Sequence, residues 1–446
     1  MKLKKYKLGD IAKIEISGVD KKTIEGETPV RLCNFVDVYY NWAITKEKAK
    51  SFMVASAKQT EIDKCSIGKG MVAITKDSET RDDIGVATYI ADDFEDVLLG
   101  YHCALITPNP AVVDGKYLNA FMHTRYIQKY FENNASGSGQ RYTLSNDTIS
   151  NIPVLLPSIE EQHIIGKLLA DLDRKIELNK QINDNLEAMA KQLYDYWFVQ
   201  FDFPNEEGKP YKSSGGAMVW NEKLKREIPE GWNVANVFDE LSVQYGFPFS
   251  TELFTEEPTS IPVVRIRDIL ENSVSAYSEE EVDEKYKLQK QDLLVGMDGN
   301  FHMNYWNDNV SYLNQRSVRL RAKSKSTVSI MQAKYDIAPY IKAKELRAKG
   351  STVGHLSDKD LKELFVLVCP NTDFRNKFDS ILAEIIENRC EMIELTKQRD
   401  ELLPLLMNGQ AMVNYHLSLH LSNTVLYTLH YLGTVQNHVV RVLKII

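Results

Sequence analysis

Long apolar runs are missing from this 446-residue chain, in which no stretch of about 18 consecutive apolar residues could form a membrane-spanning helix. Residues 1–6 are rich in lysine and lead into charged sequence without the apolar core of a signal peptide. The composition, with 43% hydrophobic and 26% charged residues, is that of a globular protein, and the length favours two or three domains. We therefore expect a cytoplasmic protein without a membrane partner.

Cysteine is also scarce. The five cysteines are odd in number, widely spaced and never arranged as CxxC beside histidines, so neither disulfides nor zinc are indicated and we interpret them as buried apolar thiols. Four of the nine histidines lie in the last segment, at His416, His420, His430 and His438. Their spacing fits no standard ligand set, which makes a metal site there the less favoured alternative.

Catalytic motifs of DNA-modifying enzymes are absent as well. An adenine methyltransferase would be expected to carry an Asn/Asp-Pro-Pro-aromatic loop and a glycine-rich cofactor turn, whereas the nearest string is PNP at 108–110. The Walker pattern GxxxxGK[ST] of ATP-driven motors is missing, and no convincing carboxylate–lysine cluster of a nuclease occurs. The sequence favours a protein that binds rather than catalyses and that needs no cofactor of its own. An enzyme with an unfamiliar active site is the less favoured alternative.

The net charge of −8 and the pI near 5.7 argue mildly against a nucleic-acid-binding protein, because neutralising phosphates requires clustered Lys and Arg. The charge is unevenly distributed, however. Residues 311–362 hold 12 Lys plus Arg against 4 Asp plus Glu, whereas residues 271–300 hold 8 acidic against 3 basic residues. The value for the whole chain therefore excludes little.

The most informative feature of the sequence is an internal repeat. LSNDTISNIPVLLP at 144–157 is a polar turn and a short apolar strand closed by proline, and LSDKDLKELFVLVCP at 356–370 repeats that order with one extra residue. Earlier in each half, GKGMVAITKD at 68–77 parallels LQKQDLLVGMDGN at 288–300. These short β-rich runs, bounded by Gly, Asp and Asn, predict small mixed α/β domains with irregular loops.

A long helical pattern follows each closing proline, with the alternating 3–4 spacing of apolar residues that is typical of a coiled-coil seam. The first predicted seam comprises Ile165, Leu168, Leu172, Lys175, Asn179, Ile182, Leu186, Met189, Leu193 and Tyr196. The second comprises Phe378, Ile381, Ile385, Asn388, Met392, Leu395, Arg399, Leu402 and Leu406. Shifting the second series back by 213 residues, the offset between Pro157 and Pro370, places each member on a member of the first. Two helices with matching seams most simply pack on one another; two unrelated amphipathic helices, each on its own domain, are the alternative.

The predicted fold class is α+β, with two pseudo-repeated mixed α/β domains separated by two long antiparallel coiled-coil helices. The predicted segments are a first domain at 1–157, a first long spacer helix at 158–200, a linker rich in Pro, Gly and Ser at 201–231, a second domain at 232–370, a second long spacer helix at 371–410, and an atypical C-terminal tail at 411–446.

Three strings connect the sequence with a known family: SIEEQHIIGKLLADLDRKIELNKQI at 158–182, YDYWFVQFDFP at 194–204 and RDELLPLLMNGQ at 399–410. Together with the order of domains and helices and with IPEGW at 228–232, they resemble the specificity subunits of type I restriction–modification systems over about residues 1–410. We find no family signature after Gln410, so the tail departs from the pattern.

The resemblance implies that the two mixed α/β domains are target-recognition domains, each reading one part of a split site in double-stranded DNA. It also implies two bound adenine methyltransferase subunits and restriction subunits that carry the motor and the nuclease. S-adenosylmethionine, ATP and magnesium would be needed only in those partner subunits. The alternative is a scaffold, or a silent recombined allele of such a subunit, that does not bind DNA.

The candidate DNA-binding residues lie mostly in loops that combine small residues with hydrogen-bonding side chains. ASGSGQRYT at 135–143 precedes the closing strand of the first domain, and RAKGSTVGHLS at 347–357 holds the equivalent place in the second. Glutamine pairs bidentately with adenine and arginine with guanine, whereas Lys and Ser more often contact phosphate. The candidates are Lys76, Thr80, Arg81, Ser138, Gln140, Arg141, Tyr142, Asn300, Asn304, Arg316, Arg319, Arg347, Lys349, Ser351, Thr352 and His355. A plain solvated loop is the alternative for each string.

Overall fold

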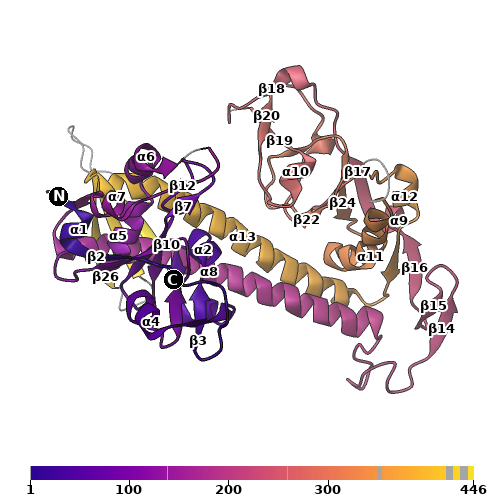
Figure 1. Ribbon diagram of the computed structural model, residues 1–446. Helices are drawn as coiled ribbons and strands as arrows, with labels where there is room; N and C mark the ends of the chain where they lie inside the picture. Colours follow the sequence, from indigo (N-terminus) through magenta and orange to yellow (C-terminus); the bar gives the residue numbers. More distant parts are fainter. Residues whose placement is uncertain are drawn as a thin grey trace. The chain divides into compact units, whose positions relative to one another are not determined.

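The computed structural model consists of two compact units (Figure 1). Unit 1 comprises Met1–Glu177 and Ile393–Ile446, and unit 2 comprises Leu178–Met392. Each unit contains a mixed α/β domain and part of each of two long helices, α8 (Ile159–Tyr194) and α13 (Thr372–Met407). The predicted class, two mixed α/β domains with two long helices, is confirmed. The structure describes residues 2–137, 139–258, 260–348, 354–417, 425–431 and 440–445.

The domain of unit 1 is built on a sheet of order β2-β10-β6-β8-β4, beside a second sheet β5-β3-β9, a small sheet β11-β12-β7 and the pair β1-β13. The strands are β1 (Lys4–Lys7), β2 (Ala12–Ile16), β3 (Thr28–Cys33), β4 (Ala43–Ile44), β5 (Met53–Ala57), β6 (Val72–Thr75), β7 (Asp77–Ser78), β8 (Ala87–Ile90), β9 (Val97–Leu99), β10 (Cys103–Pro108), β11 (Ser136–Gly137), β12 (Tyr142–Thr143) and β13 (Pro153–Leu156). The helices are α1 (Leu8–Ile11), α2 (Phe35–Tyr39), α3 (Lys46–Ala49), α4 (Gln59–Cys65), α5 (Gly115–Met122), α6 (Arg125–Asn134) and α7 (Asn146–Ser150).

The core of unit 1 forms where the sheet meets the helices. All four residues of β6 and of β8 are buried, as expected of strands covered on both faces. Tyr117 and Phe121 of α5 join a buried cluster that also contains Leu168 of α8 and Leu402 of α13. The first domain therefore shares one core with the beginning of α8 and the end of α13.

The domain of unit 2 has sheets of order β17-β24-β21-β22 and β18-β20-β19-β23 and the pairs β16-β25 and β14-β15. The strands are β14 (Met218–Asn221), β15 (Arg226–Pro229), β16 (Asn233–Asn236), β17 (Leu241–Tyr245), β18 (Phe254–Thr255), β19 (Ile261–Val264), β20 (Ala276–Ser278), β21 (Leu293–Gly296), β22 (Met303–Tyr305), β23 (Tyr312–Leu313), β24 (Ser317–Ala322) and β25 (Phe365–Val368). The helices are α9 (Val237–Glu240), α10 (Ile266–Ile269), α11 (Ile330–Ala348) and α12 (Asp358–Lys362), with short helical turns η1 (Asp195–Val199), η2 (Thr251–Leu253) and η3 (Glu284–Tyr286).

The internal repeat seen in the sequence is present in the backbone of the two domains. The pair β1-β13 corresponds to β16-β25, and in each domain the next short helix begins with a backbone hydrogen bond to the segment before the closing strand. Leu8 N donates to Ile152 O at 2.9 Å, and Val237 N donates to Leu364 O at 3.0 Å. The polar turns LSND and LSDK each begin a short helix, because the Ser145 and Ser357 hydroxyls cap α7 and α12.

Within unit 2, α8 and α13 pack side by side in antiparallel order (Figure 1). Asn388 Nδ2 donates to Asn183 Oδ1 at 2.9 Å, and Asn183 Nδ2 donates to the Ile385 carbonyl at 3.1 Å. Nearer the start of α8, Asn179 Nδ2 donates to Glu391 Oε2 at 2.6 Å. Buried amides that satisfy each other across two helices fix their register, because sliding either helix would leave polar groups without partners.

The predicted seam is confirmed for α13 and wrong for the second half of α8. Phe378, Ile385, Asn388, Leu395, Leu402 and Leu406 of α13 are buried. In α8, however, Ile182 and Met189 are 39% and 48% exposed, and their neighbours Asn183 and Ala190 are buried instead. A straight helix has 3.6 residues per turn, so its inner face drifts by about 20° per heptad relative to a 3.5-residue repeat. By the third heptad, the residue that follows each predicted seam position faces inward instead, as Asn183 and Ala190 do.

The tail contains three strands, β26 (Ala411–Leu417), β27 (Val425–Tyr431) and β28 (Val440–Ile445), in one antiparallel sheet of order β26-β27-β28. Ala411 and Val413 are buried in the core of unit 1. Among the described residues, no helix is both long and apolar enough to cross a membrane, and no group of three His, Cys, Asp or Glu side chains is placed to hold a metal ion. The four tail histidines have no described side chains.

Candidate nucleic-acid interface

A small sheet in unit 1 joins two loops that are far apart in the sequence. Strand β7 pairs with β12, so that Asp77 lies opposite Thr143, and β12 pairs with β11, so that Tyr142 lies opposite Gly137. Gly137 has a φ of +151°, and a Cβ atom there would lie 2.0 Å from the Arg141 carbonyl oxygen. Only glycine allows this close approach. The sheet therefore brings together the two sets of DNA-binding residues predicted for the first domain, around Lys76 and in the 135–143 loop.

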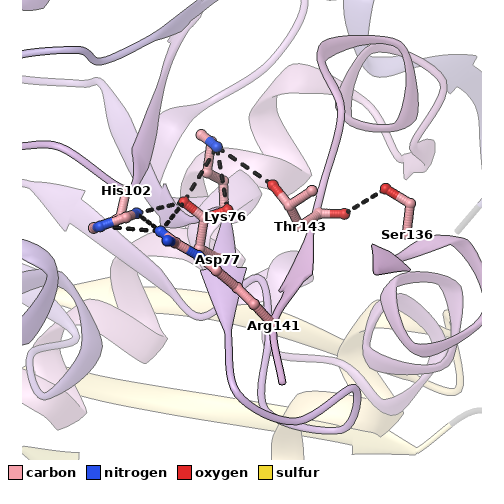
Figure 2. Close-up of polar contacts among 6 residues, drawn as sticks. All are labelled: Lys76, Asp77, His102, Ser136, Arg141 and Thr143. Atoms are coloured by element: carbon pink, nitrogen blue, oxygen red, sulfur yellow. Dashed lines mark hydrogen bonds and ion pairs between the residues drawn. The ribbon is translucent and has the colours of Figure 1, made fainter. Parts of the chain in front are cut away.

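Asp77 lies at the middle of a polar cluster that we call centre 1, formed by Lys76, Asp77, His102, Arg141 and Thr143 (Figure 2). The Asp77 carboxylate accepts a hydrogen bond from Lys76 Nζ at 3.2 Å and contacts His102 Nδ1 at 2.5 Å and the Arg141 guanidinium at 3.4 Å. Arg141 also contacts the His102 ring, and Lys76 Nζ donates to Thr143 Oγ1 at 3.3 Å. The Asp77 side chain is only 10% exposed, whereas that of Arg141 is 55% exposed. A nearly buried carboxylate thus holds the exposed Arg141 guanidinium at the surface.

The pKa of Asp77 is lowered although its burial acts in the opposite direction. Burial disfavours the charged carboxylate and raises the pKa, but hydrogen bonds with Thr143, His102 and Lys76, together with the charge of Lys76, favour the anion more strongly. Asp77 is therefore ionised at neutral pH, and its attraction for the neighbouring basic groups persists.

The remaining first-domain candidates flank centre 1. The Arg81 guanidinium lies over the Tyr142 ring, 5.0 Å from its centroid, and links the 76–81 loop to β12 a second time. Thr80 and Gln140 are exposed. Ser138 lies outside the described residues. The described members of the first predicted set therefore occupy one continuous part of the domain surface, joined by β7 and β12.

Unit 2 contains a similar cluster, centre 2, formed by Asp298, Arg316 and His355. Arg316 Nη1 donates to Asp298 Oδ2 at 2.5 Å, and His355 Nδ1 lies 2.6 Å from Asp298 Oδ1. Arg316 and His355 are 69% and 57% exposed, whereas the Asp298 side chain is 16% exposed. The pKa of Asp298 is lowered: burial raises it, but the hydrogen bonds from His355 and Arg316 and their charges outweigh that effect.

The two centres occupy equivalent places in the repeated fold. Asp77 pairs with Thr143 in β12, and Asp298 pairs with His355 through an isolated antiparallel bridge just before the same LS turn. The backbone hydrogen bonds also correspond: Lys76 N donates to His102 O at 2.9 Å, and Met297 N donates to Arg316 O at 2.9 Å.

His102 and Arg316 also share an unusual backbone conformation. Each residue immediately precedes a central strand, β10 or β24, and each has a positive φ, of 73° and 64° respectively. Residues with a Cβ rarely adopt this left-handed conformation. The fold thus places a carboxylate, a left-handed basic residue and the closing loop together twice.

The other second-domain candidates divide into exposed and internally bonded residues. Asn300 and Arg347 are exposed. Asn304 donates to the Ile269 and Leu270 carbonyls and accepts from Arg389, so its amide is used within unit 2. Arg319 is only 6% exposed and contacts Ser242 Oγ at 3.2 Å. Lys349, Ser351 and Thr352 lie outside the described residues.

Sequence patterns did not indicate four members of these centres, namely Asp77, His102, Thr143 and Asp298. Carboxylates repel phosphate, so acidic residues are not obvious candidates for contacts with DNA. A usable signal was nevertheless present: in the parallel strings 68–77 and 288–300, an aspartate follows each strand by two residues, Asp77 after β6 and Asp298 after β21. No sequence pattern around His102 indicated a role in binding, because its left-handed backbone and its contact with Asp77 depend on the path of the chain.

Chemically, the two centres present exposed nitrogen donors whose direction is set by a less exposed carboxylate. Such donors suit hydrogen bonding to base edges and to phosphate oxygens. Arg141 and Arg316 each offer several N–H groups in a planar fork, and only part of this capacity is used by the aspartates. The arrangement fits recognition of nucleic acid better than chemical transformation of it.

Comparison with known proteins supports this interpretation. Residues 2–188 and 229–404 match the family described as the type I restriction modification DNA specificity domain. The specificity subunit of the type I restriction enzyme MjaIX from Methanocaldococcus jannaschii is 27% identical over 322 residues, which cover 69% of this chain and 71% of that protein. The specificity subunit of EcoBI from Escherichia coli is 26% identical over 184 residues, covering 40% of this chain and 36% of that protein.

A solved structure shows the same fold. The S subunit of a type I restriction–modification system from M. genitalium aligns with a TM-score of 0.57 at 15% identity, covering 91% of this chain and 96% of that one. With two separate matches to one family model, the two related domains and the two long helices, the chain belongs to the family of type I restriction–modification DNA specificity subunits.

Proposed function

We propose that this protein selects the DNA sequence on which a type I restriction–modification complex acts, with one half of a split site read by each domain. The observation that carries the proposal is the pair of equivalent centres around Asp77 and Asp298, which present the exposed side chains of Arg141 in the first domain and of Arg316 and His355 in the second beside the closing loop. A family whose members are specificity subunits supplies the partner class, which is double-stranded DNA.

In the first domain we propose that Arg141 and Gln140 contact base edges and that Lys76, Thr80 and Arg81 contribute phosphate contacts. Arginine and glutamine pair bidentately with guanine and adenine, whereas lysine and hydroxyl groups more often position the protein on the backbone. In the second domain we assign base contacts to Arg316 and His355, with Asn300 and Arg347 beside them. Asn304 and Arg319 have a supporting role in this proposal because their side chains bond within the domain.

We further propose that the chain is not itself an enzyme and that it recruits two adenine methyltransferase subunits and the restriction subunits. S-adenosylmethionine, ATP and magnesium would then serve those partners only. The lengths of α8 and α13 would determine how many base pairs between the half-sites stay unread. A protein that reads genomic DNA would work in the bacterial or archaeal cytoplasm.

One surface of α8 is suited to a partner subunit. Leu178, Ile182 and Met189 of α8 are 47%, 39% and 48% exposed, and Tyr196 of η1, the turn that follows α8, is 38% exposed. At about 100° per residue, the three α8 positions fall within roughly 40° of one another around the helix axis. An apolar stripe of this kind on a long helix is typical of a surface that packs against a helix of another protein. We propose that the methyltransferase subunit binds here.

Replacing both Ile182 and Met189 with Asp is expected to lower the affinity of this chain for the methyltransferase subunit by tenfold or more, because burying each side chain contributes about 1.5–3 kcal/mol. Affinity can be measured by titration of the labelled partner. Val310 is another exposed apolar residue of unit 2, at 59%; Val310→Asp is the matched control and should leave the affinity unchanged. Equal losses for both variants would show that the stripe is not the binding surface.

The proposed function is tested by producing this chain with a matching methyltransferase subunit in cells that lack both. Genome-wide mapping of methylated adenines is expected to reveal one split sequence, absent when the methyltransferase subunit is produced alone. Methylation appears at that sequence because only the specificity subunit distinguishes bases. If the complex assembles and no split sequence appears, the chain is the non-reading scaffold or silent allele instead.

A further inference from the structure

Asp77 and Asp298 share more than their position in the repeat, since each of them neutralises basic groups that would otherwise be attracted to phosphate. Asp77 contacts Lys76, His102 and Arg141, and Asp298 contacts Arg316 and His355. A DNA-binding surface selected only for affinity would gain from losing these carboxylates, because each one offsets a positive charge. Their presence at the same place in both domains therefore calls for a different advantage.

The left-handed residues indicate what that advantage is. His102 and Arg316 hold conformations that are unfavourable for a residue with a Cβ and that glycine adopts readily. Both positions nevertheless carry a basic side chain in contact with the aspartate. A basic side chain at such a position makes a contact with the aspartate that glycine could not make. The backbone conformation sets the direction in which that side chain points.

Holding a flexible basic side chain in one orientation has a specific consequence for base reading. An exposed arginine samples many rotamers, and ordering it on binding costs conformational entropy. A phosphate contact tolerates several orientations, whereas a bidentate contact to a base requires the planar group to lie in one direction. A fixed carboxylate behind the basic group therefore favours discrimination between bases over general attraction to DNA.

We propose that Asp77 and Asp298 are positioning residues that determine base discrimination, each in the half-site read by its own domain. Asp77 acts through His102 and Arg141, and Asp298 acts through Arg316 and His355. This inference rests on the proposed function, because it concerns how the two domains read a split DNA target. It assigns a role to two acidic residues that would be counted as unfavourable in a DNA-binding protein.

The test uses the full chain with its methyltransferase subunit and compares Asp77→Asn and Asp298→Asn with the unaltered protein. Asp77→Asn is expected to relax base preference about tenfold at one or more positions of one half-site, the loss of about one base contact, and Asp298→Asn is expected to do the same in the other half. Binding to non-specific duplex DNA should be as tight or tighter. The logarithm of the affinity should fall more steeply with the logarithm of the salt concentration, by a slope of about one, because about one more counterion is released. A purely structural defect would weaken binding to every sequence alike.

Two control variants remove a carboxylate from an exposed ion pair in the same domains. Asp20→Asn breaks the pair with Lys22, and Asp283→Asn breaks the pair with Lys285; neither should alter base preference. His102→Ala and Arg316→Ala remove the positioned side chains themselves. Each should relax the base preference in the same half-site as the corresponding aspartate variant. They also serve as the test if an aspartate variant does not fold.

The inference is overturned if the aspartate variants retain full base preference in both half-sites, or if either variant relaxes the base preference in both. It is also overturned if methylation falls equally at all sites while the base preference is unchanged. A failure of the unaltered protein to direct methylation to any split sequence would overturn the proposed function, and with it this inference. A half-specific relaxation in a complex that still methylates DNA supports it.

Discussion

Exchanging residues 1–157 for the corresponding segment of another specificity subunit should change one half of the methylated sequence and leave the other half as it was. Centre 1 draws all its residues from 76–143, and centre 2 draws all its residues from 298–355. Each mismatched base pair costs about 1–3 kcal/mol, so a half-site altered at three positions loses about a hundredfold or more in affinity. The effect on target choice is therefore close to complete.

Mapping of methylated adenines in cells producing the chimaera measures this outcome directly. The reciprocal exchange of residues 232–370 is the matched control and should change only the other half. The exchanged segment keeps its own β1-β13 pairing, because both strands lie within residues 1–157. Changes in both halves, or in neither, would show that the reading residues are not divided between the domains as proposed.

Phe378→Ala is expected to lower the free energy of unfolding by about 3–5 kcal/mol, the usual cost of removing a fully buried aromatic ring. Phe378 is 0% exposed. Its ring centroid lies 6.2 Å from that of Trp197 and 5.9 Å from that of Phe198, so it connects α13 with η1. Loss of the ring leaves a cavity that these neighbouring aromatic residues cannot all move to fill.

Urea unfolding of the full chain, followed by tryptophan fluorescence, measures the loss. The matched control is Ile393→Ala on the same helix, where the side chain is 54% exposed and the change should stay within about 0.5 kcal/mol. A loss below about 1 kcal/mol for Phe378→Ala would contradict the packing described for unit 2.

Some features of the fold could be predicted because they depend on local periodicity. The polar turn and closing strand before Pro157 and Pro370 were visible as repeated strings, and the structure confirms β13 and β25 there. Burial along α13 also follows the predicted 3–4 spacing. In α8 the same rule fails beyond Asn179, since Ile182 is exposed and Asn183 is buried. A repeat of 3.5 residues and a helix of 3.6 agree over a few turns and then diverge.

The candidate site could be predicted only in part. Loops with glycine and hydrogen-bonding side chains identified Arg141 and His355 as candidates before the chain path was known. Their partners Asp77 and Asp298 could not be identified as members of a centre, because a contact across 64 or 57 residues depends on how strands pair. The internal use of Asn304 and the burial of Arg319 were likewise invisible in the sequence.

The architecture and the family of this protein could be predicted from its sequence: a duplicated mixed α/β domain, two long helices, and a resemblance to type I specificity subunits. These follow from periodicity, repetition and characteristic strings, all of which are local properties of the chain. Which side chains meet at Asp77 and Asp298, and which face of α8 stays exposed, became known from the folded structure alone. Those outcomes depend on strand pairing and helix twist, through which residues distant in sequence are brought within hydrogen-bonding distance.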